Sequence, residues 1–238
     1  MGAFLVGLLV FFMGASLTSF FNLLIYRRQR GEEVVFKRSY CEACGQELRP
    51  WDLVPLVSYL VRGGRSFCCK ERINPAYPLL ELGGGLLLVG IFWKNFPHLA
   101  YLEALYYLGF YYLALGDFWR RSIYLRDLFL LIGGLVLVGL VGKTGLLHGL
   151  PAIFLFLVFF AIQRLFPQAM GEGDPWAGLY LGLMAQNIGE AFLLFTLTFV
   201  LAAGLSLVLV ALKKASLKTQ IPLIPFMFLA SLGQYLFS

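Results

Sequence analysis

The sequence predicts an all-α polytopic membrane protein with about eight transmembrane helices and one cytoplasmic, cysteine-containing loop domain. Of the 238 residues, 60% are hydrophobic and only 13% are charged, and the mean hydropathy is +0.80. This composition excludes an ordinary soluble domain of the same length. In addition, apolar runs of about 17–25 residues, long enough to cross a bilayer, recur along nearly the whole chain.

The first apolar segment runs into Tyr26-Arg27-Arg28 without a small-residue cleavage site, so we expect a retained helix and not a signal peptide. The predicted spans are 3–25, 78–94, 99–117, 124–142, 147–166, 174–188, 190–212 and 220–237. We expect three parts in the chain. These are a first transmembrane helix (1–26), a polar loop domain (27–77) and a transmembrane core (78–238).

The positive charges predict the orientation in the membrane. With the N-terminus outside, all of the 19 Lys and Arg residues except Lys94 and Lys143 fall on the cytoplasmic side. Because cytoplasmic loops are enriched in Lys and Arg, we expect the polar loop on that side. The net charge of +6 is therefore a signal of topology. We expect lipid headgroups, and not nucleic acid, as the partner of this charge.

Two aspartates stand at the ends of apolar segments. Asp117 ends the apolar stretch 101–116, and Asp174 closes the sequence Gly171-Glu172-Gly173-Asp174. An ionisable residue near hydrocarbon is costly, and it is kept where it is solvated, paired or functional. Both aspartates are predicted at the cytoplasmic ends of helices, where two carboxylates can share a proton and activate one water. We expect them to act as a catalytic pair, whose individual roles the sequence leaves open.

Simpler interpretations of these acids stay open. Asp117 can mark a helix end and pair with a nearby Arg, and Asp174, followed by Pro175, can cap a helix. Asp127 is the alternative to Asp117 as the first catalytic aspartate, whereas Glu172 is not counted among the catalytic residues. A small proton- or cation-coupled transporter also fits intramembrane acids, although these lie at helix ends and not at the midplane. A catalytically inactive assembly protein is a third possibility.

All four cysteines lie in the polar loop. Cys41 and Cys44 form a C-x-x-C turn, and a later turn repeats its frame with Cys69 in register and Ser66 where the other cysteine would be. Paired turns of this kind suit tetrahedral zinc, and a cytoplasmic location disfavours disulfides. The candidate fourth ligand is Cys68, although its adjacency to Cys69 is awkward for chelation. Free or redox-active thiols are the alternative.

Several short motifs follow one another in order. They are Gly14 to Arg27, Arg38 to Cys44, Trp51 to Leu60, Ile73 to Glu81, Asp117 to Ile123, Gly171 to Asp174, and Ile221 to Phe226. This series resembles the signature of bacterial type IV prepilin peptidases, a leader peptidase/N-methyltransferase family of Gly-x-Gly-Asp membrane aspartyl proteases. The resemblance covers essentially the whole chain. One departure is Trp176, which stands where many relatives carry Lys.

The resemblance implies an inner-membrane endopeptidase that removes the basic leader from type IV prepilins or from pseudopilins of type II secretion. It identifies Asp117 and Asp174 as the catalytic residues. Many relatives also methylate the new N-terminus with S-adenosylmethionine, and the cysteine loop resembles that bifunctional branch; a peptidase without methyltransferase activity is the alternative. No glycine-rich nucleotide fingerprint is present. Glu81 is the candidate cofactor-binding residue, or it pairs with Arg65 or Arg72.

Overall fold

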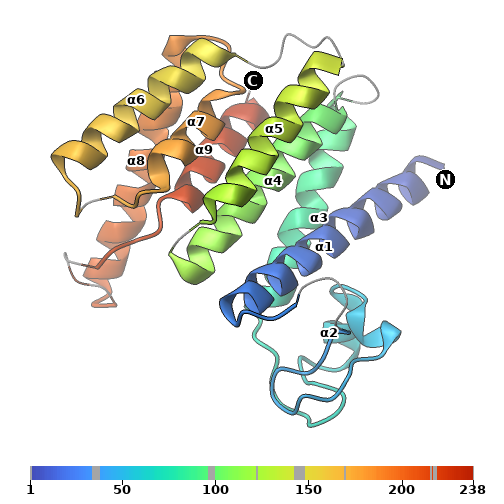
Figure 1. Cartoon of the computed structure of the whole chain (residues 1–238). Helices are drawn as coiled ribbons and strands as arrows, with labels where there is room; N and C mark the ends of the chain where they lie inside the picture. The colour runs from blue at the N-terminus through green and yellow to red at the C-terminus, as the bar shows by residue number, and fades with distance from the viewer. Residues whose placement is uncertain are drawn as a thin grey trace. The chain divides into compact units, whose positions relative to one another are not determined.

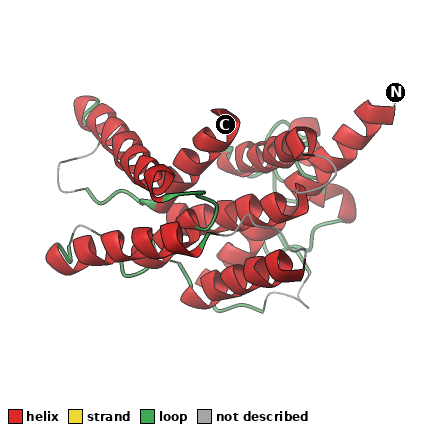
Figure 2. Cartoon of the chain, turned by 90° about the horizontal axis from the view of Figure 1, so that it is seen from above, coloured by secondary structure: helices red, strands yellow, loops and turns green. Residues whose placement is uncertain are grey.

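The computed structural model describes residues 2–33, 38–95, 100–121, 123–141, 148–168, 170–214, 216 and 219–237. Within these ranges the chain is helical and has no strand, only two isolated bridges in the polar loop (Figure 2). The predicted all-α class is therefore confirmed. Some predictions fall outside the described residues. They concern Ser122, Lys143, Lys218, and one end of each predicted span 99–117, 124–142 and 147–166.

The described part of the chain forms nine α-helices and one 3-10 turn (Figure 1). They are α1 (Gly2–Gln29), η1 (Pro50–Leu53), α2 (Val57–Val61), α3 (Ala76–Asn95), α4 (Ala100–Arg120), α5 (Leu125–Val141), α6 (Gly149–Leu165), α7 (Asp174–Gly182), α8 (Ile188–Ala211) and α9 (Ile224–Phe237). Three helices, α1, α3 and α8, are long and apolar enough to cross a membrane. Two shorter helices, α6 and α9, are also apolar. The total of eight crossings stays a prediction.

The predicted helix 174–188 is too long. In the structure α7 has nine residues and ends at Gly182, which corresponds to about 14 Å at 1.5 Å per residue. The hydrocarbon core of a bilayer is about 30 Å thick, so α7 by itself does not cross it. The following helix, α8, begins two residues before its predicted start because Asn187 caps it: the Asn187 side chain accepts a hydrogen bond from the Glu190 backbone N–H at 2.9 Å.

The chain divides into two compact units, Met1–Ala104 and Leu105–Ser238. In the first, which we call unit 1, α1 packs along α3. Glycines permit this close approach, since a Cβ added at Gly14 would collide with the backbone of Gly84. By its contacts α3 therefore belongs with α1, whereas the sequence analysis placed residues 78–95 in the transmembrane core. That functional division after residue 77 stays a prediction.

The second unit, unit 2, is arranged around α7, which packs against α5, α6 and α9 (Figure 1). Most residues of α7 are buried. A Cβ added at Gly182 would stand 2.5 Å from the Cα of Ala152 in α6, so only glycine allows this packing. On another side, the Tyr180 hydroxyl donates to the Tyr106 carbonyl of α4 at 2.9 Å, and the two rings stack. These contacts hold the C-terminal half of α7, and Asp174 lies at the other end of the same short helix.

Candidate active site and metal centre

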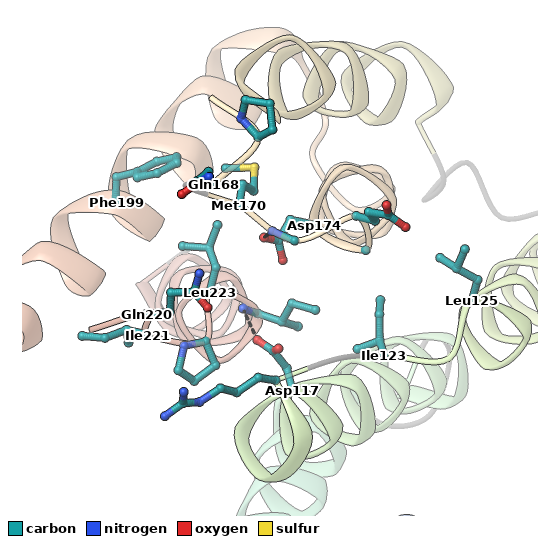
Figure 3. A pocket seen from close by; sticks show the side chains of 17 residues that line it. Asp117, Ile123, Leu125, Gln168, Met170, Asp174, Phe199, Gln220, Ile221 and Leu223 are labelled. Atoms are coloured by element: carbon teal, nitrogen blue, oxygen red, sulfur yellow. Dashed lines mark hydrogen bonds between the residues drawn. The ribbon is translucent and has the colours of Figure 1, made fainter. Parts of the chain in front are cut away.

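Asp117 lies in the last turn of α4, and only 6% of it is exposed. Its Oδ2 accepts a hydrogen bond of 3.1 Å from the backbone N–H of Ile224, the first residue of α9 (Figure 3). The start of a helix offers unpaired N–H groups and a positive dipole end, which suit a carboxylate. Directly after the helix, Arg121 adopts a left-handed conformation (φ 54°), which turns the chain away from α4.

Asp174 is the first residue of α7, and 8% of it is exposed. The residue before it, Gly173, is the N-cap, so the interpretation of Asp174 as the cap is wrong by one position. Its Oδ2 instead turns back and accepts a hydrogen bond of 2.8 Å from the Gly171 N–H. A Cβ added at Gly173 would stand 2.7 Å from Cγ1 of Ile123. Glycine is therefore required here by the close approach of Ile123.

Both aspartates point into one cavity of about 450 Å³, from opposite sides (Figure 3). Apolar side chains such as Ile123 and Leu223 form part of the wall, and Glu172 also lines it. The structure thus brings the predicted pair together from segments that are far apart in the sequence.

The two carboxylates lie in surroundings suited to acid–base chemistry. Backbone N–H groups hold each of them in place. Within the described residues neither forms an ion pair, so the alternative in which Asp117 pairs with a neighbouring Arg is not observed. Of two carboxylates that face one cavity, one can act as a proton acceptor and the other as a proton donor. Their catalytic role stays a prediction.

Two other residues named in the sequence analysis, Asp127 and Trp176, have packing roles. Asp127, in the first turn of α5, is buried and accepts a hydrogen bond from the Tyr112 hydroxyl of α4. It does not line the cavity of the two aspartates, which supports its interpretation as a structural residue. Trp176 lies against the rings of Phe129 in α5 and Phe156 in α6, with centroid distances of 5.0 and 4.8 Å. Its indole therefore fills an aromatic cluster where many relatives carry a charge.

The four cysteines form a separate cluster in the polar loop. All four sulfur atoms lie within 4.8 Å of one another, and the Cys41 and Cys69 sulfurs are 3.8 Å apart. A tetrahedral ion with Zn–S bonds of about 2.3 Å separates its sulfur ligands by about 3.8 Å. Cys44 and Cys68 complete the set, and all four are free thiols. The residues fit a metal such as zinc, with Cys68 in the place of the fourth ligand.

Ser66 takes the position that Cys41 has in the other turn. Each of the two residues donates its backbone N–H, over 2.8 Å, to the carbonyl five positions later, which explains the repeat in the sequence. The Ser66 hydroxyl lies 3.3 Å from the Cys41 sulfur and 3.0 Å from the Cys68 sulfur. Burial opposes ionisation of Cys41, but hydrogen bonds from Ser66 and from nearby backbone N–H groups lower its pKa to about 6. The thiolate, which binds metals, is therefore favoured.

Glu81 lines a second cavity, of about 360 Å³, that lies within unit 1. Its Oε2 accepts a hydrogen bond of 2.8 Å from the Leu56 N–H, and Leu56 itself has an unusual positive φ of 62°. No ion pair between Glu81 and Arg65 or Arg72 occurs in the part of the chain that the structure describes. Glu81 thus anchors the polar loop, and its role toward a cofactor stays a prediction.

Sequence reasoning did not single out two groups. The first is the Ile224 N–H that holds Asp117; a backbone contact across 107 positions leaves no signal in side-chain chemistry. The second is Asn22, whose buried carboxamide lines the cavity of unit 1 and has no hydrogen-bond partner. A signal for Asn22 was present, because a carboxamide in the middle of an apolar helix is unusual.

Apolar helices that carry two facing carboxylates define a class, that of polytopic membrane proteins with a site of the aspartyl-protease type. Residues 12–95 match the family model of the Bacterial Peptidase A24 N-terminal domain. The prepilin leader peptidase/N-methyltransferase of Pseudomonas aeruginosa is 30% identical over 213 residues, which cover 85% of this chain and 72% of the relative. This chain belongs to the prepilin leader peptidase/N-methyltransferase family.

Two further relatives carry the same name. That of Pseudomonas putida is 28% identical over 254 residues, which cover 92% of this chain and 86% of the relative. That of Vibrio cholerae is 28% identical over 209 residues, which cover 78% of this chain and 79% of the relative. No solved structure matches the chain. The likeness to these relatives therefore extends well beyond the N-terminal family model, into the segments that carry the two aspartates.

Proposed function

We propose that this protein removes the leader peptide from type IV prepilins or pseudopilins and then methylates the new N-terminus. The names of its relatives support both activities. The observation that carries the peptidase assignment is the pair Asp117 and Asp174, which faces one cavity in unit 2. A transporter is not favoured, because the family is one of peptidases and methyltransferases.

In the proposed hydrolysis, one ionised carboxylate accepts a proton from a water as the water oxygen attacks the scissile carbonyl carbon. The other carboxyl group, initially protonated, donates its proton to the carbonyl oxygen. The first carboxyl group then gives the proton that it took from the water to the amide nitrogen, a hydroxyl of the tetrahedral intermediate returns a proton to the second carboxylate, and the C–N bond breaks. A carboxylic acid and an amine leave, and both carboxyl groups regain their starting protonation. The backbone N–H groups of Gly171 and Ile224 support this proposal, since they orient both carboxylates without neutralising them.

The proposed methylation takes place on the amine that the first reaction releases. S-adenosylmethionine, when bound, supplies a methyl group on a positively charged sulfur. The chain must hold the amine beside that methyl group and receive the proton that the nitrogen loses. We assign Glu81 to this region because it lines the polar cavity of unit 1. The zinc-type cysteine site has a structural role in this proposal, since it ties together the two turns of the loop.

We place the protein in the bacterial inner membrane, with its N-terminus outside and the polar loop and both aspartates on the cytoplasmic side. Arg27 and Arg28 in the last turn of α1 and Arg120 in the last turn of α4 support this orientation. Asp117 then lies at the depth of the inner membrane surface. A prepilin with a basic leader in the cytoplasm and an apolar helix in the bilayer would present its cleavage site at that same depth.

The test replaces Asp117 and Asp174 separately by Asn and follows the size of a coexpressed prepilin. Each replacement removes a proton-transfer group while it keeps the side-chain volume, so cleavage should slow by about 10³-fold or more. Asp127→Asn is the matched control and should cleave normally, because Asp127 lies outside the cavity. Normal processing by either of the first two variants would refute the proposed pair, and loss of cleavage in Asp127→Asn would move the site to α5.

A further inference from the structure

Unit 1 contains a cavity of about 360 Å³ that is separate from the one that Asp117 and Asp174 line. Its walls come from α1, from the polar loop and from the beginning of α3. Cavities that bind small molecules usually measure about 300–1,000 Å³ and carry a few well-placed polar groups on an apolar or aromatic wall. This cavity has that character, because tyrosines and Phe20 share its wall with carboxylates and with Asn22. The proposed peptide hydrolysis uses none of these residues.

Asn22 is the observation that points to a ligand. It lies on α1, is only 6% exposed, and lines the cavity. Neither its Oδ1 nor its Nδ2 has a hydrogen-bond partner. A buried carboxamide without partners is unfavourable, and buried polar groups in native proteins are nearly always satisfied by protein, by ordered water or by a bound ligand. A molecule in the cavity that offers a donor and an acceptor side by side would satisfy both atoms of Asn22.

The chemistry of the wall restricts what that molecule is. A carboxamide pairs through two hydrogen bonds with the N6 and N7 edge of adenine, which offers one donor and one acceptor side by side. Aromatic side chains such as Phe20 and Tyr59 offer faces on which a base can stack. The described lining also contains Glu42, Asp52 and Glu81 but no Lys or Arg, and Asp52 is ion-paired with Arg62 outside the lining. An acidic wall favours a cation and disfavours the phosphates of a nucleotide.

We propose that this cavity binds the adenosyl group of S-adenosylmethionine, with the Asn22 carboxamide pairing with the edge of the adenine. The cationic sulfur fits an acidic wall, which excludes adenosine triphosphate as the occupant. This inference rests on the proposed methyltransferase activity and deepens it, because it locates the cofactor. Asn22 is a binding residue in this assignment and not a catalytic one, because it contacts the adenine and the methyl group leaves from the sulfur at the other end of the adenosyl group.

The test measures binding to the purified full-length protein in detergent by isothermal titration calorimetry, with S-adenosylhomocysteine as the probe. Asn22→Ala should weaken binding by about 10- to 100-fold, the usual value of a two-bond base contact. Gln29→Ala, an exposed change on the same helix and outside the cavity, should bind as the unaltered protein does. Adenosine triphosphate should not displace the probe.

A second probe tests the adenine contact without any variant. S-inosylhomocysteine carries an oxygen in place of the adenine amino group, so it presents two acceptors to Asn22. The unaltered protein should bind it about 10-fold or more weakly than S-adenosylhomocysteine, and Asn22→Ala should bind the two probes alike. Equal binding of both probes to the unaltered protein would overturn the proposal, and so would displacement by adenosine triphosphate.

Prepilin cleavage is followed in the same preparations, so that the two levels of proposal can fail separately. Unaltered affinity for S-adenosylhomocysteine in Asn22→Ala overturns the assignment of the cavity and leaves the methyltransferase activity standing. Absence of any binding by an unaltered protein that cleaves prepilin overturns both the cavity assignment and the methyltransferase half of the proposed function. A binding loss confined to Asn22→Ala, with discrimination between the two probes lost as well, supports the proposal.

Discussion

Gly173 offers a sharp test of how the structure positions Asp174. A Cβ at this residue would stand 2.7 Å from Cγ1 of Ile123, whereas non-bonded carbon atoms pack at about 3.5–4.0 Å. In Gly173→Ala the two segments must therefore move apart by about 1 Å. Because Asp174 is the next residue, its carboxylate shifts with the backbone. A misplacement of 1 Å costs on the order of 10²-fold in rate, so we expect prepilin cleavage to fall by about that factor.

The assay compares cleavage rates of a purified prepilin in detergent, with two further variants. Gly116→Ala is the matched control, because Gly116 is the neighbour of Asp117 and a Cβ there meets nothing within 4 Å; it should cleave at the unaltered rate. Ile123→Ala removes the atoms that the new methyl group would strike. The double variant Gly173→Ala/Ile123→Ala should therefore cleave about as fast as Ile123→Ala alone. Full activity of Gly173→Ala, or no rescue in the double variant, would refute this account of the site.

Two further outcomes are expected. Cys68→Ser should lose most of the bound zinc, whereas Ser66→Ala keeps all four thiols and should retain it, as elemental analysis of the purified protein can measure; the reverse order would exclude Cys68 as the fourth ligand. Tyr112→Phe removes the hydrogen bond from the Tyr112 hydroxyl to the buried Asp127 and should lower the free energy of unfolding by about 1–3 kcal/mol, measured by denaturant titration. The folded Tyr112→Phe protein should still cleave prepilin, and loss of cleavage at unchanged stability would count against a structural Asp127.

The helices were the most predictable part of this protein. Long apolar runs are sufficient to locate α1, α3 and α8, because a bilayer demands both length and apolar composition. The same rule fails for the predicted span 174–188. An apolar run cannot distinguish a short helix buried among others from a membrane crossing. In the structure α7 ends at Gly182, and the cap at Asn187, a hydrogen bond that apolar periodicity does not register, marks where α8 begins.

The cysteine cluster was predictable in its parts but not in its geometry. The sequence repeat predicts two matching turns, and the structure has them. The adjacency of Cys68 and Cys69 suggests poor chelation when only sequence spacing is considered. In the folded loop their sulfurs are 4.0 Å apart, close to the spacing that one tetrahedral ion requires. Side-chain directions, which the sequence does not give, therefore decide whether neighbouring thiols can share a metal.

The sequence predicts which two aspartates matter, but it does not predict the backbone N–H groups that hold their carboxylates in place. Asp117 accepts from the Ile224 N–H and Asp174 accepts from the Gly171 N–H. A lysine or arginine in the same place would also hold a carboxylate, but its charge would favour the ionised form of both acids. Hydrolysis by such a pair needs one acid to keep its proton. Neutral backbone donors thus orient the pair and still allow it to share a proton.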